Sequence, residues 1–195
     1  MSSLPRVVLS LAILAATLTG TACGDPPDKE MQQAQGAIDA ARAAGADRYA
    51  PAEYVAAQAA LKRATEAVEQ RDYRLALNHA LDARERAQAA AKEAADHKAT
   101  ARTDAEHAIT QVSSTLNEAH ARLKATEAGH APPKTAADAR REIEAGDAAV
   151  QEARTAFDHA DYLGALDALQ GVTARLRAST HDLEPAAPPP PRRRR

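Results

Sequence analysis

The stretch from residue 51 to residue 87 carries the clearest periodic pattern of apolar positions in the chain. Its large apolar residues recur every seven positions, at Tyr54, Leu61 and Val68. Alanines fill the seam between them at the three-and-four spacing of a heptad, at Ala57 and Ala64. Because apolar residues at this spacing share one face of an α-helix, the pattern predicts a helix over 52–70 that packs against a neighbour.

A short turn at 70–72 separates this helix from a second one. Asp72 is a residue type that caps helix N-termini, and Tyr73, Leu77 and Leu81 begin the returning helix. A connection of this length forces the two helices to lie antiparallel. The stretch therefore predicts a helical hairpin.

A diverged copy of this hairpin follows 89 residues later. The shift places Asp161 and Tyr162 where the first copy has Asp72 and Tyr73. A shared turn together with a shared seam indicates an internal repeat. The corresponding seam residues of the second copy are Ile143, Gly146, Val150, Ala153 and Phe157.

The complete pattern predicts an all-α protein. Its helices are expected at 28–44, 52–70, 73–128, 134–159 and 162–180. The third contains no Gly or Pro and, if it is continuous, reaches about 84 Å; the alternative is that it folds back near 95–103. The helices predict elongated antiparallel hairpins, arranged as two three-helix units at 28–98 and 99–183 that share the long central helix, in the general manner of spectrin-type repeats.

Alanine dominates the composition and limits the size of the core. The chain holds 52 alanines in its 195 residues, and aromatic residues make up 3%. Alanine is the best intrinsic helix former, but it buries little apolar surface. We therefore expect thin seams between closely spaced helices, with axes near the low end of about 8–10 Å, in place of a large globular core.

Residues 1–22 have the features of a secretion signal. Arg6 supplies a positive charge, residues 7–18 form an apolar run too short to span a bilayer, and small residues precede Cys23. This arrangement resembles the lipobox of bacterial lipoproteins, although Gly20 stands where the family usually has leucine. The resemblance implies cleavage before Cys23 and acylation of that cysteine. Simple secretion and an uncleaved anchor remain alternatives.

The cysteine count agrees with a lipid attachment point. Cys23 is the only cysteine, so the exported chain has no internal disulfide. Residues 23–27 then form a lipidated tether. Gly24 follows the cysteine where aspartate would signal retention in the inner membrane. By analogy with other lipoproteins, this predicts the periplasmic face of the outer membrane.

The C-terminal residues 184–195 are a Pro- and Arg-rich tail. Without residues 1–22 the chain has 24 Lys and Arg against 27 Asp and Glu, a net charge of −3, which becomes −7 without the last four residues. A mildly acidic body thus carries a basic tip that is suited to an anionic lipid or an acidic partner. The alternative is a solvated, disordered tail. The tip consists of Arg192, Arg193, Arg194 and Arg195.

The first hairpin resembles a known family. The residues that carry the resemblance are Tyr49-Ala50-Pro51-x-Glu53-Tyr54, Ala59-Ala60-Leu61 and Asp72-Tyr73-x-x-Ala76-Leu77. Over residues 28–95 they are similar to the alanine-rich bacterial envelope domain called domain of unknown function 4398. The resemblance implies a predicted lipoprotein and brings no catalytic residues. The OmpA-like peptidoglycan-binding module that some members carry is absent here.

The turn also resembles the second helix of tetratricopeptide repeats, which is the alternative interpretation, although the 34-residue period of those repeats is missing. Local signatures of catalysis, metal ligation and cofactor binding are absent: no two histidines lie three or four apart, and no Gly-rich phosphate loop occurs. An acidic body without interleaved aromatic residues argues against nucleic-acid binding.

The sequence therefore predicts a non-catalytic envelope lipoprotein that serves as a helical spacer or protein-docking scaffold in the periplasm. The alternative is a peptide-binding adaptor of the tetratricopeptide type. The expected partners are a membrane, through lipid at Cys23, and an envelope protein or the cell wall. Self-association through alanine seams is also open.

Overall fold

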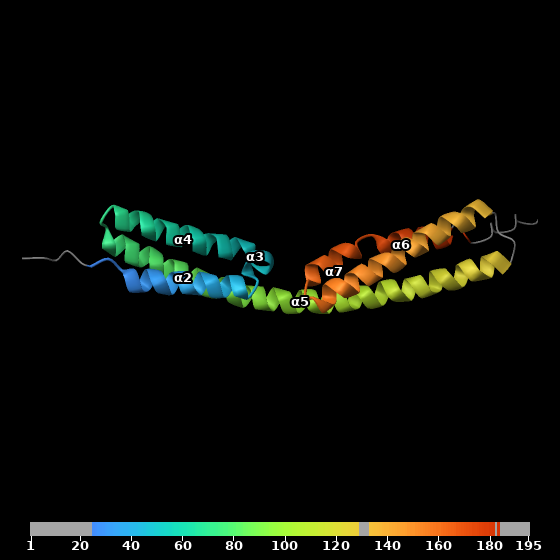
Figure 1. The fold of residues 1–195 in the computed structure, drawn as a ribbon, viewed down its shortest axis with the longest axis horizontal. Helices are drawn as coiled ribbons and strands as arrows, with labels where there is room; N and C mark the ends of the chain where they lie inside the picture. The colour runs from blue at the N-terminus through green and yellow to red at the C-terminus, as the bar shows by residue number, and fades with distance from the viewer. Residues whose placement is uncertain (1–24, 129–132, 182, 184–195) are drawn as a thin grey trace, which may run out of the picture. The chain divides into compact units, whose positions relative to one another are not determined.

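The computed structural model describes residues 25–128, 133–181 and 183, and within these ranges every regular element is an α-helix. The all-α prediction is confirmed. The chain divides into two compact units, unit 1 up to Ala95 and unit 2 from Asp96 (Figure 1). The helix α5, Tyr73–Ala128, is continuous and contributes its first part to unit 1 and the rest to unit 2. The sequence predicted a division at 98/99, which lies within one helical turn of the observed one.

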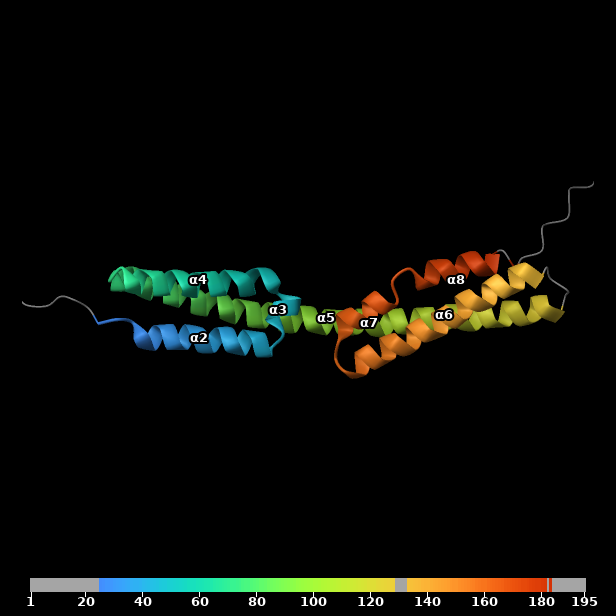
Figure 2. The same ribbon diagram turned by 45° about the horizontal axis from the view of Figure 1, so that its top comes forward.

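Unit 1 is a bundle of three helices. The helices α2 (Asp28–Ala43) and α4 (Pro51–Glu69) lie beside the first part of α5 in both ribbon views (Figures 1 and 2). The one-turn helix α3 (Ala46–Tyr49) joins α2 to α4 and was not predicted. It follows Gly45, whose φ of 87° lies in the left-handed region that favours glycine and ends α2.

The seam of unit 1 is made almost entirely of alanine. Its centre is a cluster of three fully buried residues, one from each helix: Ala34, Ala60 and Ala83. Among the described residues of this unit, the larger buried apolar side chains are Ile38, Tyr49 and Tyr54. An alanine seam lets helix backbones approach closely, so the seam excludes bulkier groups.

The positions of the large residues therefore correct the sequence prediction. Tyr54, Ala57 and Ala64 are buried as expected, but Leu61, Val68 and Leu77 are only half-buried and Leu81 is exposed. The alanines one position earlier occupy the seam instead, and the larger residues lie at its edges; these alanines are Ala60, Ala67, Ala76 and Ala80. The buried alanines of α4 and of the first part of α5 are Ala57, Ala60, Ala64, Ala67, Ala76, Ala80, Ala83, Ala87, Ala90 and Ala94.

Unit 2 packs the second part of α5 against α6 (Pro133–Asp158), α7 (Tyr162–Ala168) and α8 (Val172–His181). Its core holds larger side chains than that of unit 1. A methyl group on Gly146 would lie 2.9 Å from Leu116 Cδ2 and 3.3 Å from Leu176 Cδ2. The leucines thus fill the space that a side chain at position 146 would need. The large buried residues are Val112, Leu116, Leu123, Ile143, Val150, Leu169, Val172, Leu176 and Leu183.

The single helix predicted over 162–180 is wrong, because it is two helices. Gly171 has a φ of 72° and separates α7 from α8. A residue in this conformation cannot continue a right-handed helix, so α8 starts again at Val172.

The two hairpin turns have the same hydrogen-bond pattern, which supports the predicted repeat. In the first, the amide of Asp72 donates to Ala67 O at 2.9 Å and that of Arg71 to Val68 O at 2.9 Å. In the second, Asp161 donates to Ala156 O and Ala160 to Phe157 O at the same distances. This is the Schellman arrangement that ends helices.

The aspartate that completes each Schellman turn also caps the next helix. Oδ1 of Asp72 accepts from the amide of Leu75 at 2.9 Å, and Oδ1 of Asp161 accepts from that of Gly164 at 3.0 Å. One residue therefore ends one helix and starts the next, which explains how the connection can be so short.

Both turns place a non-glycine residue in the left-handed region, Arg71 at φ 59° and Ala160 at φ 58°. We predict that Ala160→Gly raises the free energy of unfolding by about 1 kcal/mol, because glycine adopts this conformation without the clash of a Cβ atom. Urea denaturation followed by circular dichroism measures the change. As the reverse control, Gly171→Ala should lower stability. A destabilising Ala160→Gly would contradict the strain argument.

The alanine seam generates a second prediction. Ala83→Leu should lower the free energy of unfolding by about 1–3 kcal/mol, because the site is fully buried among alanines of three helices and has no room for the added carbons. Ala89→Leu is the matched control, since Ala89 lies on the same helix and is exposed. Equal unfolding midpoints in urea for the two variants would show that the seam is not close-packed.

Candidate functional site

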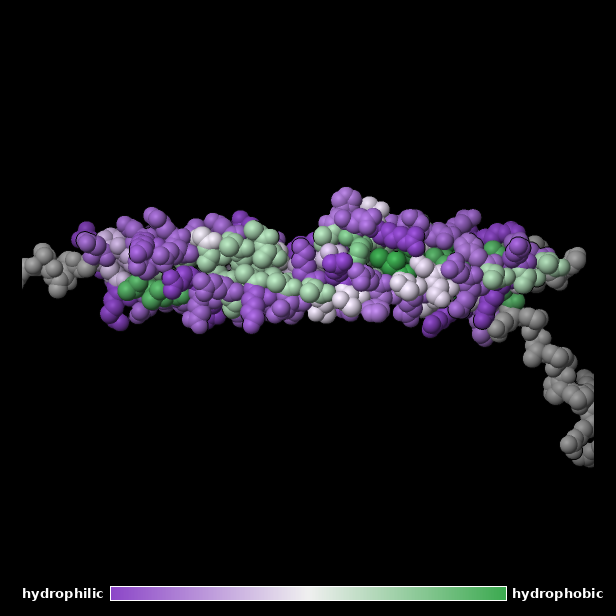
Figure 3. All heavy atoms as spheres, turned by 90° about the horizontal axis from the view of Figure 1, so that it is seen from below, coloured by the Kyte–Doolittle hydropathy of each residue, from purple (hydrophilic) through white to green (hydrophobic). Residues whose placement is uncertain are grey.

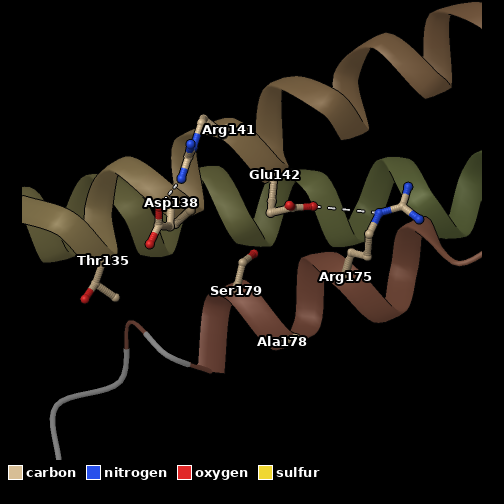
Figure 4. A pocket seen from close by; sticks show the side chains of 8 residues that line it. Thr135, Asp138, Arg141, Glu142, Arg175, Ala178 and Ser179 are labelled. Atoms are coloured by element: carbon tan, nitrogen blue, oxygen red, sulfur yellow. Dashed lines mark hydrogen bonds and ion pairs between the residues drawn. The ribbon is translucent and has the colours of Figure 1, made fainter.

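An open groove of about 830 Å³ lies within unit 2, between α6 and α8. Figure 4 shows side chains from both helices along it, with two arginines each directed at a carboxylate. The lining residues are Thr135, Asp138, Ala139, Arg141, Glu142, Arg175, Ala178 and Ser179.

The charged groups of this groove neutralise one another. Arg175 Nε lies 3.7 Å from Glu142 Oε2, and Arg141 pairs with Asp138 on the same helix. All four side chains are largely exposed. Exposed pairs of this kind contribute only about 0–1 kcal/mol each to stability, and their charged groups remain in contact with solvent.

Two hydroxyl groups line this groove, those of Thr135 and Ser179. Ser179 Oγ donates its proton to the backbone oxygen of Leu176 at 2.9 Å. The carboxylates of Asp138 and Glu142 are each paired with an arginine. None of these described contacts joins a hydroxyl to a general base, which an activated nucleophile would require.

A smaller groove of about 260 Å³ lies between α5 and α8 of the same unit. Two of its residues, Thr115 and Thr180, are buried, and their hydroxyls donate to Gln111 O at 3.1 Å and to Leu176 O at 2.9 Å. Both hydroxyl groups therefore donate to backbone oxygens one turn earlier in their own helices. The groove is also lined by Glu118, Ala119, Arg122, Arg177 and His181.

One group has a displaced pKa, and its cause is local. Arg42 Nε donates to the hydroxyl of the buried Tyr54 at 2.7 Å, and this hydrogen bond raises the pKa of Arg42. The guanidinium also lies 5.8 Å from the centre of the Tyr54 ring. The contact joins α2 to α4. Because arginine stays charged at all accessible pH values, Arg42 does not serve as a proton-transfer group.

The candidate residues named from the sequence, Cys23 and the arginines Arg192, Arg193, Arg194 and Arg195, lie outside the described residues. In the part of the chain that is described, no three His, Cys, Asp or Glu side chains come together as a metal site. No described helix has the length and apolar character needed to cross a membrane.

The sequence did not single out the first turns of α5, where the structure exposes a set of adjacent side chains. We call Arg74, Leu75, Asn78 and Leu81 the α5 outer face. Leu75 is 36% and Leu81 is 40% exposed, and Val55 on α4, at 59%, is the other large apolar residue exposed in the described chain. The sequence analysis named Leu81 only as part of the start of the returning helix, and the spacing of the leucines did not indicate that Leu75 and Leu81 would be exposed.

The face seen in Figure 3 is mostly hydrophilic, with areas of weakly hydrophobic residues and smaller groups of strongly hydrophobic ones between the charged residues. Comparison of the chain with protein-family models, curated proteins and solved structures finds no match.

Proposed function

We propose that this chain is a non-catalytic lipoprotein of a bacterial cell envelope that serves as a helical spacer and docking scaffold. Acyl chains on Cys23 hold it on a membrane leaflet, on the periplasmic side of the outer membrane. The residues before Cys23 support this assignment through their resemblance to a lipoprotein signal.

The observation that carries the scaffold role is the continuity of α5. One helix of 56 residues takes part in both units, so the backbone connection between them is itself hydrogen-bonded helix. A flexible linker would contain glycine or proline, and none occurs between Tyr73 and Ala128. This continuity supports the proposal of a structural role for the chain.

The lining of the grooves favours a scaffold over a peptide-binding adaptor. Helical-repeat adaptors bind extended peptides in concave surfaces that offer apolar anchors and amide groups. The groove between α6 and α8 offers paired charges and small side chains instead. Partners are therefore expected to dock on helix faces and on the terminal segments.

The first test of this function is membrane attachment. We predict that the wild-type chain fractionates with the cell envelope and carries the mass of an acylated N-terminal cysteine. Cys23→Ser should move the chain to the soluble periplasmic fraction, because the acyl chains contribute about 0.8 kcal/mol per buried methylene group. Density-gradient fractionation and intact-mass analysis measure both. An unmodified mature mass for the wild type would reject the lipoprotein proposal.

The second test concerns the basic tip formed by Arg192, Arg193, Arg194 and Arg195. We predict that deleting residues 188–195 abolishes crosslinks from the anchored chain to a second envelope component and leaves the helical circular-dichroism signal intact. A chain that keeps its prolines but has these arginines replaced by glutamine separates the role of charge from that of length. Crosslinks that persist in both variants would remove the tip from the scaffold proposal.

A further inference from the structure

The described chain begins at the end of unit 1 that carries the α5 outer face. Cys23 precedes Asp25, the first described residue, by two positions in the sequence. Pro26 and Pro27 are held to the start of α2 by backbone hydrogen bonds. Pro26 O accepts from the amide of Asp28 at 2.9 Å, and Pro27 O accepts from that of Met31 at 3.0 Å.

The start of α2 is in turn level with the first turns of α5. Arg84 Nη1 donates to Gln33 Oε1 at 2.8 Å and thereby aligns the two helices. Counting back at 1.5 Å per residue, Asp28 is about 8 Å before Gln33 and Leu77 is about 10 Å before Arg84. Both ribbon views place the start of α2 beside the turn between α4 and α5 (Figures 1 and 2).

Two exposed leucines flank one face of α5 at this end. Leu75 and Leu81 are six residues apart, which places them about 120° apart around α5, with Arg74 and Asn78 exposed between them. The two leucines thus bracket one face of about two helical turns. The long side chain of Arg74 lies between them and can reach toward phosphate groups while its methylenes remain beside the leucines.

We propose that the α5 outer face rests on the bilayer surface that holds the acylated Cys23. This inference depends on the proposed function, since without the acyl chains unit 1 has no reason to lie near a membrane. Leu75 and Leu81 enter the boundary between headgroups and acyl chains, and Arg74 contacts headgroup phosphate. The contact orients unit 1, while the acyl chains supply the attachment.

The nearby charges indicate that apolar insertion is the main contribution to the proposed membrane contact. Arg71 and Arg74 at this end are accompanied by the carboxylates of Glu69 and Asp72, and the start of α2 adds Asp25, Asp28 and Glu30 against Lys29. Carboxylates outnumber cations here, so the net charge gives no attraction to an anionic membrane. The contact should therefore persist at high ionic strength, unlike binding through a polybasic segment.

The experiment uses the full mature chain with acylated Cys23, reconstituted into vesicles of phosphatidylethanolamine and phosphatidylglycerol. In this form the sulfur of the one native cysteine is blocked, so a single introduced cysteine is the only free thiol. Leu75→Cys, Leu81→Cys, Ala89→Cys and Val55→Cys are each labelled with an environment-sensitive fluorophore. Quenching is measured with nitroxide-labelled phosphatidylcholine in the same vesicles, at low and high salt.

Val55 is the control, because it is exposed on α4 and lies about 160° around that helix from Glu53, whose carboxylate contacts Arg86 of α5. Its side chain therefore points away from the side of α4 that faces α5. Ala89 is exposed on the same face of α5 as the two leucines, about 12 Å beyond Leu81, so its label shows how far along the helix the contact extends. Interfacial helices insert only about 5–10 Å, so the label at 55 should not be reached. The labels at 75 and 81 should be quenched at least about twofold more strongly than the label at 55, at both salt concentrations.

The outcomes separate this inference from the function on which it rests. If the vesicles carry the protein but all four labels are quenched equally or not at all, the α5 outer face does not contact the bilayer and the lipoprotein proposal stands. If the chain fails to float with the vesicles although its mass shows acylation, anchoring through Cys23 is wrong and the inference falls with it. Quenching at 75 and 81 that disappears at high salt would replace apolar insertion with electrostatic contact and overturn the proposal.

Discussion

The close approach of alanine to alanine at the helix seams is the interaction on which unit 1 depends. Ala34, Ala60 and Ala83 meet with no exposed surface, and each contributes a single methyl group. Such a seam buries little apolar area, so much of the stability must come from helix formation, for which alanine is the best residue. The same seam has no room for larger residues, which is why leucines of this unit lie at the edges or on the surface.

Unit 2 contains the same type of hairpin, but the side-chain volume in its core is distributed differently. The repeat aligns Ala57 with Gly146, and the space released by removing a methyl group is occupied by Leu116 of α5 and Leu176 of α8. Cores tolerate changes in individual residues if the total volume is kept. The two copies could therefore diverge in their seams while the turn, which depends on backbone hydrogen bonds and one aspartate, stayed the same.

The sequence was sufficient for the fold class, the hairpin turns and the continuity of α5, because these follow from helix propensity and from capping residues. It was insufficient where the backbone dihedral of a single glycine determines whether a helix ends. Gly45 and Gly171 adopt left-handed conformations that create α3 and split the last predicted helix, yet other glycines in this chain remain helical. The heptad rule also misplaced Leu61 and Val68, since it assigns the largest residues to the seam and this seam is filled mostly by alanine.

The candidate functional residues also fall into a group that the sequence could suggest and a group that it could not. Motif reasoning predicted Cys23 and the terminal arginines as functional residues, and these lie outside the described part of the chain. It could not find the α5 outer face, because whether a leucine on an alanine-rich helix faces a partner or solvent depends on which alanines form the seam. That choice is made by three helices together and is not encoded in the spacing of any one of them.

An alanine seam leaves a further problem, because identical methyl groups can slide past one another and do not specify register. The polar groups at its edges provide what the seam lacks. Arg86 contacts Glu53 of α4 at 3.6 Å, and Arg63 of α4 contacts Asp82 at 3.8 Å, so shifting α4 by one turn would break both. Each exposed pair contributes only about 0–1 kcal/mol to stability. Their larger effect is to distinguish the native register from its neighbours, whose alanine contacts are nearly equal in energy, and the Schellman turn at one end of the hairpin fixes the same register through the backbone.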